Sequence, residues 1–351
     1  MSSKIKHFFI ISLLLVIFIL YTISNISYNL PEENIPSNAL ISDCKCKIND
    51  YVELYQKLNG NYLVRFKQAT YELDPSKHVF TCDLYNTLKR GPNQKVISYS
   101  LFGKEKLYYK LIYDIVYRIK KLYPDHLIRI YHDESLDKSF MCDLECSQRH
   151  VDFCNIKKLP LDTFNKSNYL NVDFINSRMW RFLAVGDTFV DLFHSRDSDS
   201  MVLQRERDSV EEWLKTDNVV HIMRDHPKHC TLILAGMWGF KTVQDRKLAR
   251  LMYEKLINAT IGKIFNPDGK SLNRFGDQNF LAEFLYPKIF KKATIHDSYT
   301  CKLFNDSKPF PTRRSGQCHV GLIGNCNSYS KFPFECPIEC RPDNHLDWDT
   351  C

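Results

Sequence analysis

The stretch TFVDLFHSRDSDS, residues 188–200, places an apolar-rich run directly ahead of two aspartates. The run predicts a β-strand over residues 188–195. Side chains two positions apart in an extended segment point to the same side, so Asp197 and Asp199 can converge on one cation. Ligands that offer only oxygen suit a hard divalent ion such as Mg²⁺ or Mn²⁺. The stretch therefore predicts a metal site at the end of a strand.

The D-x-D pattern needs support from its surroundings. Asp347 and Asp349 repeat it in a cysteine-rich tail, where no strand precedes it. A solvated acidic turn is the alternative interpretation of residues 197–199.

Strand-like and helix-like segments alternate on both sides of this stretch. The strand-like segments are residues 96–102, 126–133, 150–156, 219–227, 231–238 and a short final one in 293–301. The helix-like segments are residues 105–122, 178–183, 205–214, 245–258 and 276–286, the last with Asp277 as its N-cap. This alternation predicts an α/β fold, a Rossmann-like sheet flanked by helices. Such sheets bind ligands at the carboxyl ends of their strands.

The amino end predicts a membrane anchor. Residues 8–23 carry no charge and are mostly apolar, and Lys4 and Lys6 precede them. We expect a cytosolic tail over residues 1–7 and a signal anchor over 8–28, with the remainder in the lumen of the endoplasmic reticulum or Golgi. A cleaved signal peptide is the alternative, but no A-x-A-like site follows the run. Residues 29–94 would form a stem and an N-terminal subregion.

The 13 cysteines agree with a lumenal location. All lie at or after Cys44, and several form close pairs: Cys44 and Cys46, Cys142 and Cys146, Cys336 and Cys340. This usage favours disulfides over zinc, because the second pair of a zinc finger or ribbon is absent. The odd count leaves at least one thiol free or intermolecular, and we expect residues 315–351 to form a disulfide-stapled cap. Sequons at Asn165, Asn258 and Asn305 fit the same compartment.

The charge distribution argues against a nucleic-acid partner. The net charge is +7, and Lys and Arg occur in short pairs rather than in concentrated stripes. Anionic small substrates remain possible.

The order of short motifs carries a family resemblance. Arg178 and Arg181 precede the strand and the D-x-D, and Ala235-Gly236, Asp277-Gln278, His296 and Lys308-Pro309 follow. This order resembles that of glycogenin-like retaining glycosyltransferases of the GT-A type. The segments SYSLFG, MWRFLAVGD, SRDSDS, HIMRDHP, LAGMWG, FGDQNFL, HDSYTC and PFPTRR resemble a group of type II membrane glycosyltransferase-like proteins. That likeness covers roughly residues 95–345 and implies a catalytic domain over 95–314.

The resemblance implies a glycosyltransferase that uses a nucleotide-diphosphate sugar, Mn²⁺ or Mg²⁺, and a glycan, glycoprotein or lipid acceptor. The expected metal ligands are Asp197, Asp199 and His296, with His319 in reserve. The expected catalytic residues are Asp277 and Gln278. The expected donor-binding residues are Tyr99, Arg178, Arg181, Gly236, Lys308, Arg313 and Arg314.

Each of these assignments has a structural alternative. Arg178 and Arg181 could instead pair with Asp187 or Asp191, and Asp277 could serve only as a helix cap. His296 could be a buried structural histidine, and the basic group at 308–314 a solvated loop. Asp225, His226 and His229 could be a metal site, although Pro227 favours a turn lining the sugar pocket. For the whole chain, the alternatives are another metal-dependent transferase, for example of phosphoryl groups, or a disulfide-stabilised binding protein on a transferase-like fold.

Overall fold

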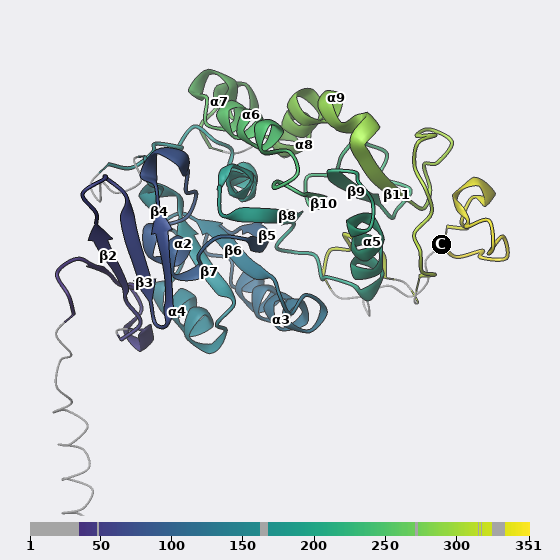
Figure 1. Cartoon of the computed structure of the whole chain (residues 1–351). Coiled ribbons are helices and arrows are strands. Elements are labelled where there is room, and N and C mark those ends of the chain that lie inside the picture. The colour runs from purple at the N-terminus through teal and green to yellow at the C-terminus, as the bar shows by residue number, and fades with distance from the viewer. Residues whose placement is uncertain are drawn as a thin grey trace, which may run out of the picture. The chain divides into compact units, whose positions relative to one another are not determined.

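A computed structural model describes residues 35–47, 49–161, 168–270, 273–314, 316, 318–324 and 334–351 (Figure 1). The predicted cytosolic tail and signal anchor lie outside the described residues, as does the sequon at Asn165. The chain divides between Ala39 and Leu40, and the unit Leu40–Cys351 contains strands β2 to β11. Among the described residues, no helix combines the length and the apolar character that crossing a membrane requires.

Seven strands form the central sheet, in the order β11-β9-β10-β8-β5-β6-β7. These strands are β5 (Gln94–Ser100), β6 (Leu127–His132), β7 (Val151–Asn155), β8 (Val190–Arg196), β9 (Val220–Arg224), β10 (Met237–Phe240) and β11 (Ala293–Asp297). β10 runs antiparallel to both of its neighbours, and the other pairings are parallel. The sheet is therefore mixed and mostly parallel, and β5, β6, β7, β8, β9 and β11 end at the same edge.

Helices cover both faces of this sheet (Figure 1). The helices are α2 (Leu84–Arg90), α3 (Lys106–Leu122), α4 (Lys138–Ser147), α5 (Gln204–Leu214), α6 (Arg246–Leu256), α7 (Ala259–Phe265), α8 (Gly276–Phe280) and α9 (Tyr286–Ile289). The shorter or irregular turns are η1 (Lys45–Lys47), η2 (Pro75–Lys77), η3 (Ile156–Lys158), η4 (Ser177–Gly186), η5 (Leu281–Leu285), η6 (Phe290–Lys292) and η8 (Ile338–Cys340).

Alternation along the strands gives the sheet two apolar cores. Val96 and Phe193 pack with η4, α6 and α8 on one face, whereas Ile97 and Leu192 pack with α3, α4 and α5 on the other. Because both faces are covered, the strands are buried almost throughout, and their polar residues are buried together with the apolar ones. The opening stretch is thus fixed in a central position, with β8 between β5 and β10.

The N-terminal subregion is a small antiparallel sheet. Its strands are β2 (Val52–Gln56), β3 (Tyr62–Phe66) and β4 (Ala69–Leu73). The short strand β1 (Ala39–Leu40) precedes them in the chain. The apolar side chains of these strands pack around Phe80, Tyr85 and Phe189.

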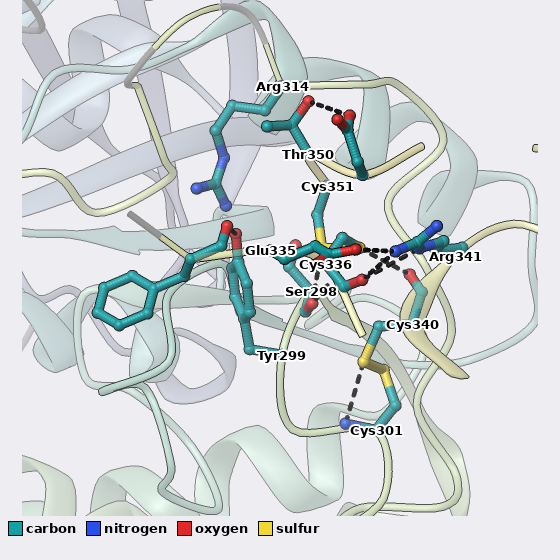
Figure 2. The surroundings of a disulfide bond; sticks show 12 residues. Ser298, Tyr299, Cys301, Arg314, Glu335, Cys336, Cys340, Arg341, Thr350 and Cys351 are labelled. Atoms are coloured by element: carbon teal, nitrogen blue, oxygen red, sulfur yellow. Dashed lines mark hydrogen bonds and ion pairs between the residues drawn. A yellow bond between two sulfur atoms is a disulfide. The ribbon is translucent and has the colours of Figure 1, made fainter. Parts of the chain in front are cut away.

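Five disulfides form among the described residues, and none joins the two members of a close cysteine pair. Their pairings are Cys44–Cys142, Cys46–Cys146, Cys82–Cys154, Cys301–Cys340 and Cys336–Cys351. The first two fasten η1 to α4, and the last two staple the tail beside Ser298 (Figure 2). Cys318 is disulfide-bonded as well, and Cys230 is a free, exposed thiol among the described residues. The odd cysteine count is therefore accounted for by a surface thiol.

Two local predictions differ from the structure. The strand expected over residues 231–238 begins only at Met237, because the carbonyls of Thr231 and Leu232 accept hydrogen bonds from Arg224 instead of joining the sheet. The helix expected to be capped by Asp277 has Phe275 as its N-cap, and Asp277 lies inside its first turn. That shift frees the Asp277 side chain for another contact.

Candidate functional site

The two aspartates of the D-x-D follow the carboxyl end of β8. The Asp197 carboxylate accepts a hydrogen bond from Arg181 Nη1 at 2.5 Å, and 42 % of its side chain is exposed. Burial raises the pKa of Asp199, and the negative charge of Asp197 raises it further. The two aspartates lie beyond the end of β8, in a turn in which Ser200 N donates to the Asp197 carbonyl at 3.3 Å.

Arg181 connects Asp197 to a third carboxylate. The turn η4 is docked on β5, because Ser98 Oγ donates to the Arg181 carbonyl at 2.7 Å and Arg181 N donates to Ser100 Oγ at 2.9 Å. The Arg181 guanidinium is buried and also donates to Asp277 Oδ2 at 2.9 Å. Burial raises the pKa of Asp277, partly opposed by the charge of Arg181. Residues about 80 to 100 positions apart thus meet at one edge of the sheet.

The alternative ion pairs for Arg181 are not formed. Asp187 pairs with Arg129 at 2.7 Å, and Asp191 pairs with Arg246. Arg178, one helical turn before Arg181, lies with its guanidinium 5.9 Å from the centre of the Phe102 ring. Phe102 follows the carboxyl end of β5, so Arg178 faces the same edge of the sheet.

Gly236 lies against the D-x-D. A Cβ atom at this position would fall 1.9 Å from Asp197 Oδ2, so any side chain here would displace the carboxylate. Ser195 Oγ donates to the Ala235 carbonyl at 2.6 Å and holds the Ala235-Gly236 segment in place. Close packing against Asp197 therefore requires a glycine at position 236.

These donors fit a hard divalent cation. Asp197 and Asp199 offer only carboxylate oxygens, which Mg²⁺ and Mn²⁺ prefer, whereas Asp277 is joined to Asp197 through Arg181. The bare Gly236 backbone leaves room for the Asp197 carboxylate on one side, and its partial exposure leaves it accessible on the other. A different cluster of potential ligand atoms, Asp297, Cys301 and Cys340, does not fit a metal, because its two sulfurs form a disulfide.

Tyr99 does not contribute to this site, contrary to prediction. Its side chain is fully buried in the core formed with α3 and α5, on the opposite face of the sheet from Ser98 and Ser100. Tyr99 and Leu101 alternate with Ser98 and Ser100, and this alternation does not show which face of β5 is directed toward η4.

The basic group at residues 308–314 does not converge on the D-x-D either. Lys308 pairs with Glu212, Arg313 with Asp349, and Arg314 with the buried Asp225 at 2.9 Å. Each cation has its own carboxylate, so the expected second clamp on a diphosphate is absent from the described residues. Gln278 is half-buried, and its backbone N–H donates to Asp277 Oδ1 at 2.9 Å.

His296 is engaged away from the D-x-D. Its Nδ1 is 2.7 Å from His221 Nε2, and its Nε2 is 3.1 Å from Glu212 Oε2. Both ring nitrogens therefore have partners on the α5 side of the sheet, and the contacts match the alternative of a buried structural histidine. His296 also ends a row of buried histidines that runs through Trp213 and His194 to His126.

This row makes stability depend on pH. Burial lowers the pKa of His126 to about 4 and holds the pKa values of His194 and His221 well below 6.5. The folded state keeps these rings neutral, so their contribution is fully present above pH 6.5 and is lost as pH falls toward 4. We expect the free energy of unfolding, measured in urea, to drop between pH 6.5 and 4.5 by up to ~1.4 kcal/mol per pH unit for each histidine. Burial raises the pKa of Asp83 to about 6 and also raises the pKa values of Asp199 and Asp277, and these three groups oppose the trend.

The variant His194→Leu isolates the effect, since it removes one titrating ring. Its unfolding free energy should vary less steeply with pH than that of the wild type. Equal slopes would contradict the assignment of the pH dependence to this row.

A histidine turn follows the carboxyl end of β9. The rings of His226, His229 and His319 have centroids 4.6 to 5.7 Å apart. His226 Nδ1 accepts a hydrogen bond from the Lys228 N–H, and His229 Nδ1 accepts one from the Asp225 N–H. Because these lone pairs are used within the turn, the geometry favours a turn over a metal-binding motif.

The sequence-based analysis missed the role of the segment that contains His319. Gly324 N donates to the Asp199 carbonyl at 2.8 Å, and Ser200 and Ile323 form a β-bridge. Residues 318–324 are thereby joined to the D-x-D. Their sequence gives no strand or helix signal, so only the fold shows this contact.

Comparisons with known proteins give distant structural likenesses. The chain matches no protein-family model and no curated protein sequence. A glycosyltransferase involved in glycosylating the major capsid of PBCV-1 is 18 % identical over 59 % of this chain and 82 % of that chain, with a TM-score of 0.32. The mannosyltransferase Ktr4p from S. cerevisiae is 10 % identical over 74 % and 80 %, with a TM-score of 0.35. The mannosyltransferase PcManGT from Pyrobaculum calidifontis, solved with GDP-Man and Mn²⁺, is 12 % identical over 57 % and 75 %, with a TM-score of 0.29.

Proposed function

We propose that this protein is a metal-dependent glycosyltransferase of the GT-A type that uses a nucleotide-diphosphate sugar. The observation that carries the proposal is the meeting of Asp197, Asp199, Arg181 and Asp277 at the carboxyl edge of a mostly parallel sheet. Such edges are where open α/β sheets bind ligands. The order of these residues in the chain agrees with the motif order of glycogenin-like enzymes.

Asp197 and Asp199 would hold Mn²⁺ or Mg²⁺. When bound, the ion neutralises the negative charge that develops on a diphosphate leaving group. Arg181 fixes the orientation of Asp197 and Asp277 through one guanidinium, so the two carboxylates keep a constant separation. Gly236 allows Asp197 to keep this position.

Asp277 would contact the transferred sugar or the acceptor hydroxyl. Its pKa, raised by burial, makes it a stronger base than an exposed carboxylate, as general-base catalysis favours. Gln278 is its nearest polar neighbour in sequence and would supply an amide to the same substrate. Arg178, beside Phe102 at the end of β5, would contact the donor.

The disulfides support a secretory-pathway location. In this proposal residues 8–28 anchor the chain in the Golgi or endoplasmic reticulum membrane as a type II protein. The acceptor would be a lumenal glycan, glycoprotein or lipid.

Nucleoside-diphosphate binding tests the proposal directly. We expect the purified protein to bind a nucleoside diphosphate in Mn²⁺, with a dissociation constant on the order of 1 µM to 1 mM, the usual range of enzyme–substrate affinities. Binding should vanish in EDTA. The measurement is calorimetry with UDP and GDP, followed by hydrolysis of a panel of nucleotide sugars to identify the donor. Absence of binding to every nucleoside diphosphate in Mn²⁺ would refute a transferase of this kind.

A further inference from the structure

The segment Cys318–Gly324, which we name the strap, connects the D-x-D to a buried carboxylate. At one end, Gly324 N donates to the Asp199 carbonyl at 2.8 Å, and Ile323 bridges Ser200. Near the other end, Val320 N donates to Asp225 Oδ2 at 2.9 Å. The strap thus crosses from the carboxyl end of β9 to that of β8.

The middle of the strap packs on the segment that cradles Asp197. Gly321 has a φ of +83°, and a Cβ atom there would fall 2.4 Å from Met237 Sδ. Met237 is itself buried and directly follows Gly236. The strap therefore presses on the same short stretch whose glycine lies against Asp197.

The anchor of the strap is rigid. Asp225 is fully buried and accepts hydrogen bonds from two Arg205 nitrogens at 3.1 Å, from Arg314 at 2.9 Å and from Ser298 Oγ at 2.5 Å. Figure 2 shows Ser298 beside Cys336 and Cys351, whose disulfide staples the tail at this point. A carboxylate held by so many donors cannot move without breaking several of them.

We propose that the strap is a positioning element that fixes Asp199 in its cation-binding orientation; this inference rests on the proposed function. Asp199 lies three residues beyond the end of β8, where the sheet no longer holds the backbone. The main-chain bond from Gly324 to the Asp199 carbonyl, with the bridge between Ile323 and Ser200, holds the backbone there. The strap acts through Asp199 and does not itself contact the donor.

The substitution Gly321→Val tests this role, with Gly60→Val as its control. Both glycines have a φ of +83°, which a β-branched residue does not tolerate, so both variants carry the same backbone strain. Gly60 lies in the turn between β2 and β3 with no atom within 4 Å of its Cβ position. We expect Gly321→Val to weaken Mn²⁺ binding about 10- to 100-fold, as loss of supporting contacts does at other metal sites. Gly60→Val should bind Mn²⁺ as the wild type does.

Two measurements decide the outcome. Mn²⁺ affinity is titrated by calorimetry below the melting temperature of each variant, and amide hydrogen exchange of residues 199–203 is followed without metal. Faster exchange and weaker binding in Gly321→Val alone support the strap. Wild-type affinity in that variant overturns it while leaving the proposed function intact. A wild-type protein that binds no Mn²⁺ overturns both. If Gly321→Val does not fold, Gly324→Val, with a φ of +78° and no atom within 4 Å, takes its place with the same expected results.

Discussion

Replacing Asp197 and Asp199 together by asparagine should abolish Mn²⁺-dependent nucleoside-diphosphate binding and transferase activity. The double variant keeps the size of both side chains but removes two negative charges from the cation site. We expect activity to fall by at least ~10³-fold, comparable with the loss of a principal electrostatic group in other enzymes. Stability should fall modestly, because the buried Arg181 loses its partly exposed partner Asp197 but keeps Asp277. Calorimetry with UDP or GDP, with thermal melting in parallel, provides the measurement.

The second D-x-D of the chain is a matched control. Asp347 and Asp349 have the same spacing but lie in the tail, where their side chains are 77 % and 68 % exposed. Their replacement by asparagine should leave metal-dependent binding unchanged. If the 197/199 variant still binds a nucleoside diphosphate with wild-type affinity in Mn²⁺, the metal site lies elsewhere.

Most strands and helices near the site could be predicted because their signals are local. Apolar runs located β5, β6, β7, β8 and β9, and helical periodicity located α3, α5 and α6. The predicted start of β10 was wrong because the side chain of a residue outside this segment determines where the strand begins. The Arg224 side chain donates hydrogen bonds to the carbonyls of Thr231 and Leu232, which keeps the residues before β10 out of the sheet.

The candidate site could also be predicted only in part from the sequence. Asp197, Asp199, Arg181, Gly236 and Asp277 were nominated from motif order, and the fold brings them to one edge of the sheet. Their metal and catalytic roles remain predictions. The sequence could not show that Arg181 pairs with Asp277, since 96 residues separate them.

The nominated residues that lie away from the D-x-D share one physical feature. Lys308, Arg314 and His296 have the chemistry of ligand-binding residues, but each is paired with a carboxylate far away in sequence. A charge that is already paired in the folded protein cannot be told from a free one in the sequence. Tyr99 lies away from the site for another reason, because both faces of β5 are covered and the alternation of serines with Tyr99 does not show which face meets η4.

Buried ion pairs explain several of the motifs that carried the family resemblance. Arg196 of SRDSDS pairs with Glu206 at 2.6 Å, and Arg224 of HIMRDHP pairs with Asp297 at 2.6 Å. Arg314 of PFPTRR pairs with Asp225. These pairs lie at or near the carboxyl ends of β8, β9 and β11. Many motif residues therefore shape the edge of the sheet on which the site is built.

Among these pairs, the loss of Asp225 should have the largest effect on stability. Although burial by itself raises the pKa of Asp225, the charges of Arg205 and Arg314 hold it well below its usual range. The variant Asp225→Asn leaves both guanidinium groups buried without their carboxylate. We expect the free energy of unfolding, from urea denaturation at pH 7, to fall by about 3 to 5 kcal/mol, as when one partner of a buried ion pair is removed.

The sign of the pH dependence gives an independent check on Asp225. Its depressed folded pKa stabilises the protein above the unfolded value near 4, and this contribution is lost as pH falls below that value. The difference in unfolding free energy between wild type and Asp225→Asn should therefore shrink on acidification below pH 4. The exposed pair Arg250–Glu254 serves as the control, since Glu254→Gln should cost less than ~1 kcal/mol. Equal costs for the two variants would mean that the Asp225 cluster does not hold the end of β9 in the way its hydrogen bonds indicate.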